Sequence, residues 1–362
     1  MKYSIIIPYH SNRQLLNTCV QAVICTVPEN TEILVIANND DPEELDLNMP
    51  AQCRVIKVNK SLYYPRAVNL GAQEAKGEYI VLMDADICVR QGWLEAFAAA
   101  FERYPDVGGC SAKMLDPFDG SVKEFGIGFT GYNFPHPFAG RGEKFDVLCC
   151  DREVQAFCSA LSIYRRAIYL EVGGMDEQLV DGYSDIDLCL RFHAKGFRTY
   201  VIANAVAYHY GSSTLGSGMS AHLRADTKGY FMLKSGGLCR TDMDTYYGLA
   251  FTNANLSFAP EYFLTDFTTI ADSQRHYDLF SQLGCFQWSG IYRLPAIRRD
   301  AAHISLYTHL DDNIRRRCQP ICYFVDDFRA LRRNHIWYEL RNCGQDLVID
   351  RNANVLLMQE VH

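Results

Sequence analysis

Two aspartates stand two residues apart directly after an apolar run: Asp84-Ala85-Asp86 follows Glu78-Tyr-Ile-Val-Leu-Met83. The apolar run predicts a buried strand, so both carboxylates leave the hydrophobic layer together and enter a loop. Hard divalent cations such as Mg2+ and Mn2+ prefer oxygen ligands and keep open positions for a substrate phosphate. The pair therefore favours a metal site shared with a diphosphate, although the same pattern also occurs as a solvated turn or a helix cap.

A second acidic group comprises Asp181, Asp185 and Asp187, at the start of a helix expected over 185–195. A carboxylate at a helix start can cap the helix and interact favourably with its dipole. Three acids within residues 181–187 are more than a cap requires, and a carboxylate at the edge of a cleft can act as a general base. We expect Asp185 in that role, with Asp181 or Asp187 as alternatives.

His209 ends the apolar run Ala205-Val-Ala-Tyr-His209, much as Asp86 follows the end of its own run. A histidine at the end of a strand can ligate a metal, and it can equally be a structural residue with satisfied hydrogen bonds. The residues alone leave both roles open.

The elements that must position these side chains alternate between strands and helices. Such alternation predicts parallel strands joined by crossover helices, with ligands bound beyond the carboxyl ends of the strands. We therefore expect the polar residues that follow several strands to meet at one edge of a sheet. The expected strands are 3–8, 32–37, 53–58 and 78–83, and the expected helices are 13–25, 65–75 and 93–103.

The rest of the chain has a different composition. Residues 108–141 are rich in glycine, proline and aromatics and predict long loops or a small antiparallel sheet. We expect a first domain over 1–225 and a C-terminal extension over 226–362 that is mainly helical and ends in a hairpin near 346–358. Further elements are expected at 165–172, 185–195 and 221–233 as helices, and at 198–203 and 205–209 as two strands.

Composition excludes several classes of protein. The 362 residues include 35 basic and 43 acidic ones, and a net charge of −8 argues against a nucleic-acid binder. The longest apolar runs are far shorter than the roughly 20 residues that cross a bilayer. The 14 cysteines are scattered, without a Cys-x-x-Cys pair and without an expected signal peptide, so we expect a reduced, cytoplasmic protein with no structural zinc site.

Eight motifs occur in an order and at spacings that can be compared with known families. They are Ser4-Ile-Ile-Ile-Pro8, Glu32-Ile-Leu-Val-Ile36, Arg66-Ala-Val-Asn-Leu-Gly71, Asp84-Ala-Asp86, Cys158-Ser-Ala160, Gly173-Gly-Met-Asp-Glu177, Asp185-Ile-Asp-Leu-Cys-Leu-Arg191 and Tyr208-His209. Together they resemble the family 2 glycosyltransferases over about residues 1–235. The resemblance implies a GT-A fold, a Rossmann-like α/β domain whose mostly parallel central sheet is flanked by helices. It also implies inverting transfer from a nucleotide-diphospho-sugar in polysaccharide biosynthesis, with Mn2+ or Mg2+ as cofactor.

The resemblance also implies roles for individual residues. Asp86 and His209 would be metal ligands, and Asp185 would be the catalytic base. Asp84 would face the ribose or a metal-bound water. The remaining contacts to the nucleotide-sugar would come from Pro8, Tyr9, His10, Asn38, Asp40, Arg66, Asn69 and Ala85.

Two positions depart from the family pattern. The family commonly has an acid directly after the second strand, where this chain has Ala37 and Asn38, so uracil as the base rests on the resemblance alone. Ser184 replaces the acid that often precedes the catalytic aspartate. Two other functions stay open: a sugar nucleotidyltransferase, although residues 9–13 lack the glycine-rich loop it should have, and a degenerate glycan-binding protein without chemistry.

The C-terminal region suggests contacts with an acceptor, which would be a glycan or a lipid-linked sugar. Its arginine clusters would either hold the enzyme to anionic lipids at the inner face of a membrane or pair with nearby acids on a solvated face. Its aromatic residues would either stack on acceptor sugars or pack in a core. The arginines are Arg315, Arg316, Arg317, Arg332 and Arg333, the acids Asp311, Asp312, Asp326 and Asp327, and the aromatics Tyr246, Tyr247, Trp288 and Tyr292.

Overall fold

The protein is described from a computed structural model in which the chain forms two compact units. The first comprises Met1–Ile127 and Gly142–Cys239, and the second comprises Gly128–Arg141 and Arg240–His362. The structure describes residues 2–131, 133–180, 182–211, 221–268, 273–284, 286–293, 317–329, 331 and 344–361.

A ten-stranded sheet forms the centre of the first unit, in the order β3-β2-β1-β4-β9-β6-β10-β5, with β7 beside β6 and β8 beside β10. Strands β1 to β4 run parallel to one another, and β10 is parallel to β6. Only β9 reverses direction between β4 and β6, so the parallel strands on both sides of it end at the same edge. The strands are β1 (Tyr3–Tyr9), β2 (Glu32–Asn38), β3 (Cys53–Val58), β4 (Tyr79–Met83), β5 (Ile87–Val89), β6 (Val107–Leu115), β7 (Val122–Glu124), β8 (Arg152–Glu153), β9 (Leu161–Arg165) and β10 (Arg198–His209).

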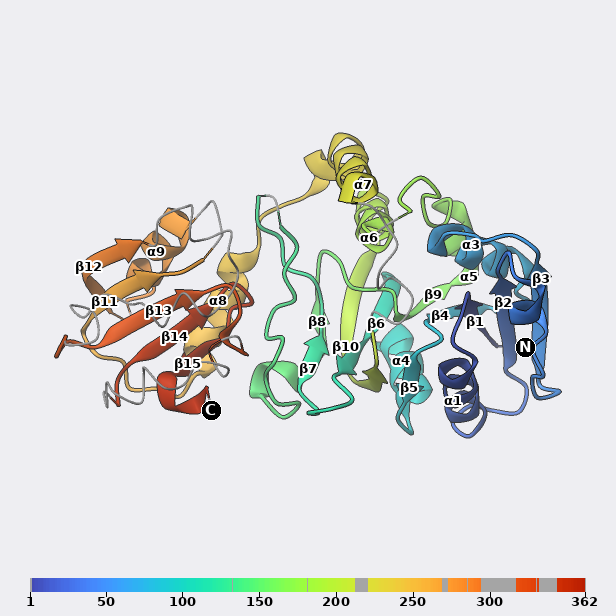
Figure 1. The fold of residues 1–362 in the computed structure, drawn as a ribbon, viewed down its shortest axis with the longest axis horizontal. Helices are drawn as coiled ribbons and strands as arrows, with labels where there is room; N and C mark the ends of the chain where they lie inside the picture. The colour runs from blue at the N-terminus through green and yellow to red at the C-terminus, as the bar shows by residue number, and fades with distance from the viewer. Residues whose placement is uncertain are drawn as a thin grey trace. The chain divides into compact units, whose positions relative to one another are not determined.

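Helices cover both faces of this sheet (Figure 1), with α1 and α4 on one face and α3, α5 and α6 on the other. Apolar residues of α1 and α4, such as Val20 and Phe97, share one core with Ile5 and Ile7 of β1. Ile6 points to the opposite face, where Gly71 of α3 packs directly against it. The helices are α1 (Arg13–Ile24), α2 (Pro42–Leu45), α3 (Tyr64–Glu74), α4 (Trp93–Arg103), α5 (Arg166–Glu171), α6 (Ser184–Ala194) and α7 (Ala221–Ser235).

The expected elements of the first unit are confirmed, with two corrections. Residues 108–115, expected as part of a loop or small antiparallel sheet, belong to the central strand β6, whose Gly108-Gly109 pair hides its strand character. Glycine is required there because a Cβ at Gly109 would lie 2.7 Å from the Tyr164 ring. The two strands expected over 198–209 are one strand, β10, with an irregularity in its pairing between Ile202 and Val206.

The second unit contains a five-stranded sheet in the order β12-β11-β13-β14-β15. The expectation of a mainly helical extension is therefore wrong. Strands such as β13 are buried on both faces and carry no alternating pattern by which to recognise them. The terminal hairpin is confirmed, because β14 pairs antiparallel with β15. The elements are α8 (Met243–Asn253), β11 (Glu261–Asp266), α9 (Ser273–Gln282), β12 (Gln287–Arg293), β13 (Ile321–Val325), β14 (Leu347–Asp350) and β15 (Val355–Leu357).

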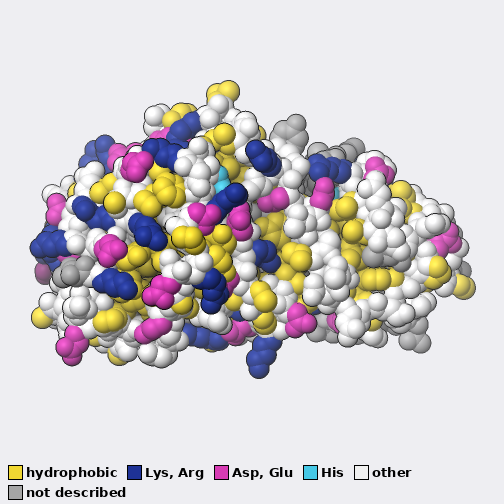
Figure 2. Space-filling view, turned by 180° about the vertical axis from the view of Figure 1, so that it is seen from behind, with side chains coloured by type: hydrophobic (Ala, Val, Ile, Leu, Met, Phe, Trp, Pro, Cys, Tyr) yellow, Lys and Arg dark blue, Asp and Glu magenta, His cyan; other side chains and the backbone are white. Residues whose placement is uncertain are grey.

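The surface carries charges of both signs, and the described cysteines form no disulfide. Acidic and basic side chains are interspersed over the face seen in Figure 2. Every cysteine that the structure describes is a free thiol. Of the helices it describes, none combines the length and the hydropathy of a membrane span.

Candidate active site

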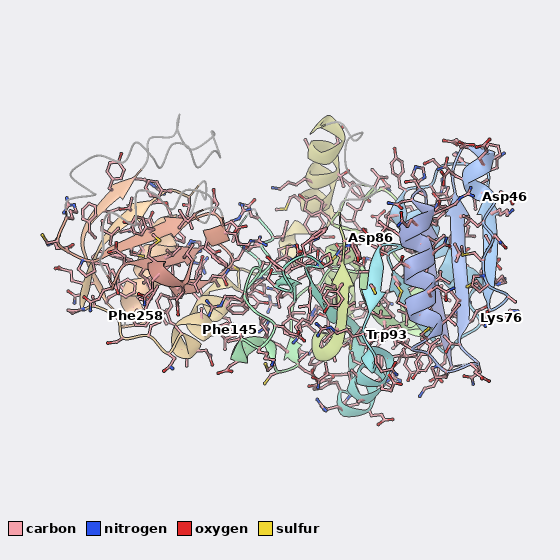
Figure 3. All side chains as sticks on the ribbon, turned by 60° about the horizontal axis from the view of Figure 1, so that its bottom comes forward. Asp46, Lys76, Asp86, Trp93, Phe145 and Phe258 are labelled. Carbon is pink, nitrogen blue, oxygen red and sulfur yellow. The ribbon has the colours of Figure 1, made fainter. Side chains whose placement is uncertain are left out.

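Asp84, Asp86 and His209 meet beyond the carboxyl end of β4. Asp84 and Asp86 belong to a tight turn in which the amide of Ile87 donates to the carbonyl of Asp84, at 3.1 Å. The turn leads into β5, which pairs antiparallel with β10 so that His209 stands opposite Ile87. Figure 3 shows Asp86 toward the edge of the sheet that also carries Asp46, away from Lys76 and Trp93.

The three side chains have the spacing of a cation site. One ligand atom from each lies within 4.8 Å of the others. Nε2 of His209 is 3.5 Å from Oδ1 of Asp86 and 3.9 Å from Oδ2 of Asp84. Oδ1 of Asp84 is buried and has no hydrogen-bond partner among the residues that the structure describes. Oxygen and imidazole donors with spare capacity suit Mn2+ or Mg2+.

The electrostatics of this cluster favour positive charge at the imidazole. Burial lowers the pKa of His209, but the nearby carboxylates of Asp86, Glu124 and Asp84 outweigh it and raise that pKa to about 10. Burial raises the pKa of Asp84 to about 7; the charge of Asp86 adds to that rise, while His209 opposes it. A cation among these carboxylates would stabilise their ionised forms.

Asp185 faces the same region from the first turn of α6. Its Oδ1 accepts a hydrogen bond from the amide of Ile186 at 2.8 Å, and its Oδ2 accepts one from the amide of Ser159 at 3.3 Å. Burial raises the pKa of Asp185, and these two amide donors lower it in part. The side chain is thus fixed at a helix N-terminus while it keeps lone pairs for a proton.

The two alternative bases are in different situations. Asp187 is fully buried and lies 2.8 Å from Nε of Arg191, 3.0 Å from Nζ of Lys234 and 2.6 Å from the hydroxyl of Ser235. The contacts with Lys234 and Ser235 join α6 to α7, so the carboxylate of Asp187 serves the packing of two helices. Asp181 lies outside the described residues.

One cavity of about 600 Å³ connects the metal cluster with Asp185. A volume of this size is typical of a site for a small organic ligand. Of the residues expected in the site, those that line it are Pro8, His10, Asn38, Asp84, Ala85, Asp86, Asp185 and His209.

Asn38 lines this cavity at the ends of β1 and β2, and its side-chain amide bonds to backbone groups. Its Nδ2 donates to the carbonyls of Tyr9 and Ile36, at 3.0 and 3.3 Å, and its Oδ1 accepts from the amide of Leu62, at 2.9 Å. Nδ1 of His10 is 2.9 Å from the carbonyl oxygen of Asn38. Asn38 therefore holds two strand ends and the following loop together.

Four expected residues do not line the cavity. Tyr9 is buried and donates its hydroxyl to Glu44, at 2.5 Å. Asp40 accepts a hydrogen bond from the amide of Ser61, at 3.1 Å.

The other two, Arg66 and Asn69, hold the loop at 173–177. Arg66 pairs with Glu177 at 3.1 Å. Asn69 donates to the carbonyl of Met175 at 2.8 Å and accepts from its amide at 2.9 Å. These contacts fasten the loop to α3.

The cavity wall includes residues that carried no signal in the sequence. Glu124 lies with its Oε1 3.7 Å from Nδ1 of His209. The hydroxyl of Tyr64 is 3.3 Å from that of Ser159, and Tyr63 lines the cavity while 51% exposed. The aromatic pair Tyr63-Tyr64 at the start of α3 could have drawn notice, whereas Glu124 lies in a segment without periodicity.

The aromatic and arginine residues of the C-terminal region are partly described. Tyr246 and Tyr247 are buried, so their role is core packing. Trp288 packs edge-on against Phe286, with the ring centroids 4.8 Å apart. Tyr292 packs, half-buried, on the core of the second unit. The arginines and acids outside the described residues are Arg315, Arg316, Arg332, Arg333, Asp311 and Asp312.

Comparison with known proteins relates part of this chain to a family. Residues 4–173 match the model of Glycosyl transferase family 2. The chain is 30% identical over 226 residues to the O-antigen biosynthesis protein RfbC of Myxococcus xanthus, which covers 59% of this chain and 18% of that protein. It is 23% identical over 202 residues to the pre-mycofactocin glycosyltransferase of Mycobacterium tuberculosis, covering 54% and 40% of the two chains. The chain thus spans less than half of the length of either relative.

A solved structure shares the fold. The crystal structure of GalNAc-T7 with UDP, GalNAc and Mn2+ matches with a TM-score of 0.52 at 15% identity, covering 79% of this chain and 55% of that one. The first unit accordingly has the GT-A fold.

Proposed function

Residues 4–173 of this chain match the model of glycosyl transferase family 2, and on that basis we propose that the chain is an inverting, metal-dependent glycosyltransferase. The proposed reaction moves a sugar from a nucleotide-diphospho-sugar to a glycan or lipid-linked acceptor in polysaccharide biosynthesis. The observation that carries the proposal is that one cavity holds both the cation-type cluster Asp84, Asp86 and His209 and the carboxylate of Asp185. Residues 1–225 would bind the donor and perform the reaction, and 226–362 would serve acceptor binding or membrane association.

The nucleoside would occupy the end of the cavity near Asn38, and its diphosphate would reach the metal cluster. Backbone groups at the ends of β1 and β2 are held there by the amide of Asn38. Tyr63, half exposed beside them, offers a ring on which a base can stack. A uracil base is supported by the family and not by a specific side chain, because the amide of Asn38 bonds to backbone groups.

Asp185 would act as the general base. The acceptor oxygen attacks the anomeric carbon from the face opposite the diphosphate, and its proton passes to the carboxylate of Asp185. The bond between the anomeric carbon and the diphosphate oxygen breaks, so the configuration inverts. The amides of Ser159 and Ile186 hold the carboxylate in place for this transfer.

Asp86 and His209 would hold the cation, with Asp84 beside it or bound to its water. The cation would supply positive charge that stabilises the departing diphosphate. The neighbouring Glu124 would fix the imidazole through its other nitrogen.

A panel of nucleotide-sugars tests the proposal. UDP-sugars with Mn2+ should raise the melting temperature more than GDP- or TDP-sugars, because a ligand that binds only the folded state stabilises it. One of them should release nucleoside diphosphate when glycan acceptors are added. Release of nucleoside diphosphate from a GDP- or TDP-sugar would mean that the donor base is not uracil. Consumption of a nucleoside triphosphate with release of pyrophosphate would replace the proposal by a nucleotidyltransferase, and glycan binding without turnover would replace it by a binding protein.

A further inference from the structure

We propose that Phe118 and Tyr210 form a platform on which an acceptor sugar ring stacks at the mouth of the catalytic cavity. The proposal deepens the proposed function and rests on it. Phe118 is 85% exposed and Tyr210 is 38% exposed. Their ring centroids are 6.3 Å apart with an interplanar angle of 85°, which is an edge-to-face contact. In this arrangement apolar ring faces stay exposed to solvent. The apolar C–H faces of pyranose rings suit such surfaces.

The turn that carries Phe118 is held by hydrogen bonds. Oδ1 of Asp116 accepts from the amide of Phe118 at 2.9 Å, and Oδ1 of Asp119 accepts from the amide of Ser121 at 2.8 Å. Two backbone bonds close the turn, from the amide of Asp116 to the carbonyl of Ser121 and from that of Gly120 to the carbonyl of Asp116. Phe118 thus has little backbone entropy left to lose on binding, which favours recognition by a preformed surface.

Tyr210 is bonded to the metal cluster directly, and the turn of Phe118 is linked to it through Lys123 of the following strand. The amide of Tyr210 donates to the carbonyl of Asp86, at 3.2 Å. Nζ of Lys123 donates to the carbonyls of His209 and Tyr210, at 3.2 and 3.3 Å. Lys123 belongs to β7, the strand that follows the turn of Phe118, and it lines the cavity. A sugar on the platform would therefore lie beside the reacting centre.

The order of strands makes the occupant an acceptor sugar and not the nucleobase. The nucleoside end of the cavity lies at β1 and β2. Phe118 follows β6 and Tyr210 follows β10, on the other side of β4 from β1 and β2. In the order of the sheet, β4 and β9 therefore separate the platform from the nucleoside end.

The test is kinetic, with an acceptor identified in the nucleotide-sugar panel. Phe118→Ala and Tyr210→Ala should each raise the acceptor KM by about 10-fold, as expected for loss of one aromatic contact, with the donor KM unchanged. Phe118→Trp should keep the acceptor KM near its wild-type value. Leu233→Ala, which removes a 91% exposed apolar side chain of α7, should change neither constant. An unchanged acceptor KM in both alanine variants would overturn the proposal.

Oligosaccharide binding separates this proposal from the proposed function. Cellotetraose and chitotetraose would be titrated into wild-type protein and Phe118→Ala by calorimetry. Weaker binding by the variant would support the platform even if no nucleotide-sugar were turned over. Equal affinities of the two proteins for both oligosaccharides, or no binding by either protein, would contradict the platform. The proposed function is tested separately, by the release of nucleoside diphosphate.

Discussion

Nε2 of His209 lies 3.5 Å from Oδ1 of Asp86, although these residues come from distant parts of the chain. The antiparallel pairing of β5 with β10 sets this distance, because it places His209 opposite the residue that follows Asp86. Asp84 and Glu124 complete the surroundings of the imidazole. The strand pairing therefore builds a site for positive charge at the edge where the parallel strands end.

A first prediction concerns the cation. A chelator should abolish transfer, and Mn2+ or Mg2+ should restore it. Asp86→Asn should be nearly inactive while still folded, because the amide loses the charge that binds a hard cation. Initial rates with and without chelator, together with melting curves, check both statements. Full activity in the presence of chelator would refute metal dependence.

Asp46→Asn is the matched control for that variant. Asp46 is 91% exposed, and its Oδ1 lies 3.8 Å from Nζ of Lys57. Figure 3 shows Asp46 toward the same edge of the sheet as Asp86. The substitution is chemically the same, so an equal loss of activity in Asp46→Asn would mean that general loss of negative charge, and not the cation site, explains the effect.

A second prediction concerns pH. The base works as a carboxylate, and burial holds the pKa of Asp185 above the ordinary 3.8. As pH falls, Asp185 takes up its proton earlier than an exposed aspartate, so kcat/KM should decline on the acid side at pH values above 3.8. A pH profile of kcat/KM at fixed Mn2+ measures this decline, and UDP binding over the same range shows whether the donor site is intact. A profile that stays flat down to pH 4 would speak against Asp185.

The sequence predicted the positions that end or follow a buried run. Asp84, Asp86 and His209 are of this kind, and the shared edge of a parallel sheet brings such positions together. Glu124 could not be predicted, because it reaches His209 through the pairing of β7 with β6, a strand concealed by Gly108-Gly109.

Side-chain partners were harder to predict than positions. Asn38 and Asn69 were expected to contact the donor, yet their amides bond to backbone groups. Which partner an amide takes depends on loops that return from elsewhere in the chain. The second sheet was missed for a related reason, since strands buried on both faces lack the alternation that identifies a strand.

A third prediction concerns membranes. Arg317 is exposed and its guanidinium stacks over the Phe263 ring, 3.7 Å from the centroid, while Asp327 pairs with Arg329 at 2.7 Å. If the arginine cluster binds anionic lipids at about 1 kcal/mol per residue, the protein should sediment with anionic vesicles at low salt and less at high salt. Replacing Arg315, Arg316 and Arg317 by Gln should weaken binding.

Arg103→Gln and Arg198→Gln are controls for this experiment. Both remove exposed arginines from the first unit and should leave vesicle binding unchanged. Absence of sedimentation at low salt would leave the arginines as part of a solvated face, with the acceptor reached from solution.

The central claim is that Asp185 removes the proton of the acceptor, and the rate of nucleoside diphosphate release by Asp185→Asn beside Asp187→Asn tests it most directly. Asp185→Asn should lower kcat by about 10²- to 10⁴-fold with UDP binding and melting temperature unchanged. Asp187→Asn should lower the melting temperature by several degrees, because Arg191 and Lys234 lose a buried partner, while the folded fraction keeps its turnover. Wild-type rates in Asp185→Asn, with turnover lost in folded Asp187→Asn, would contradict the account.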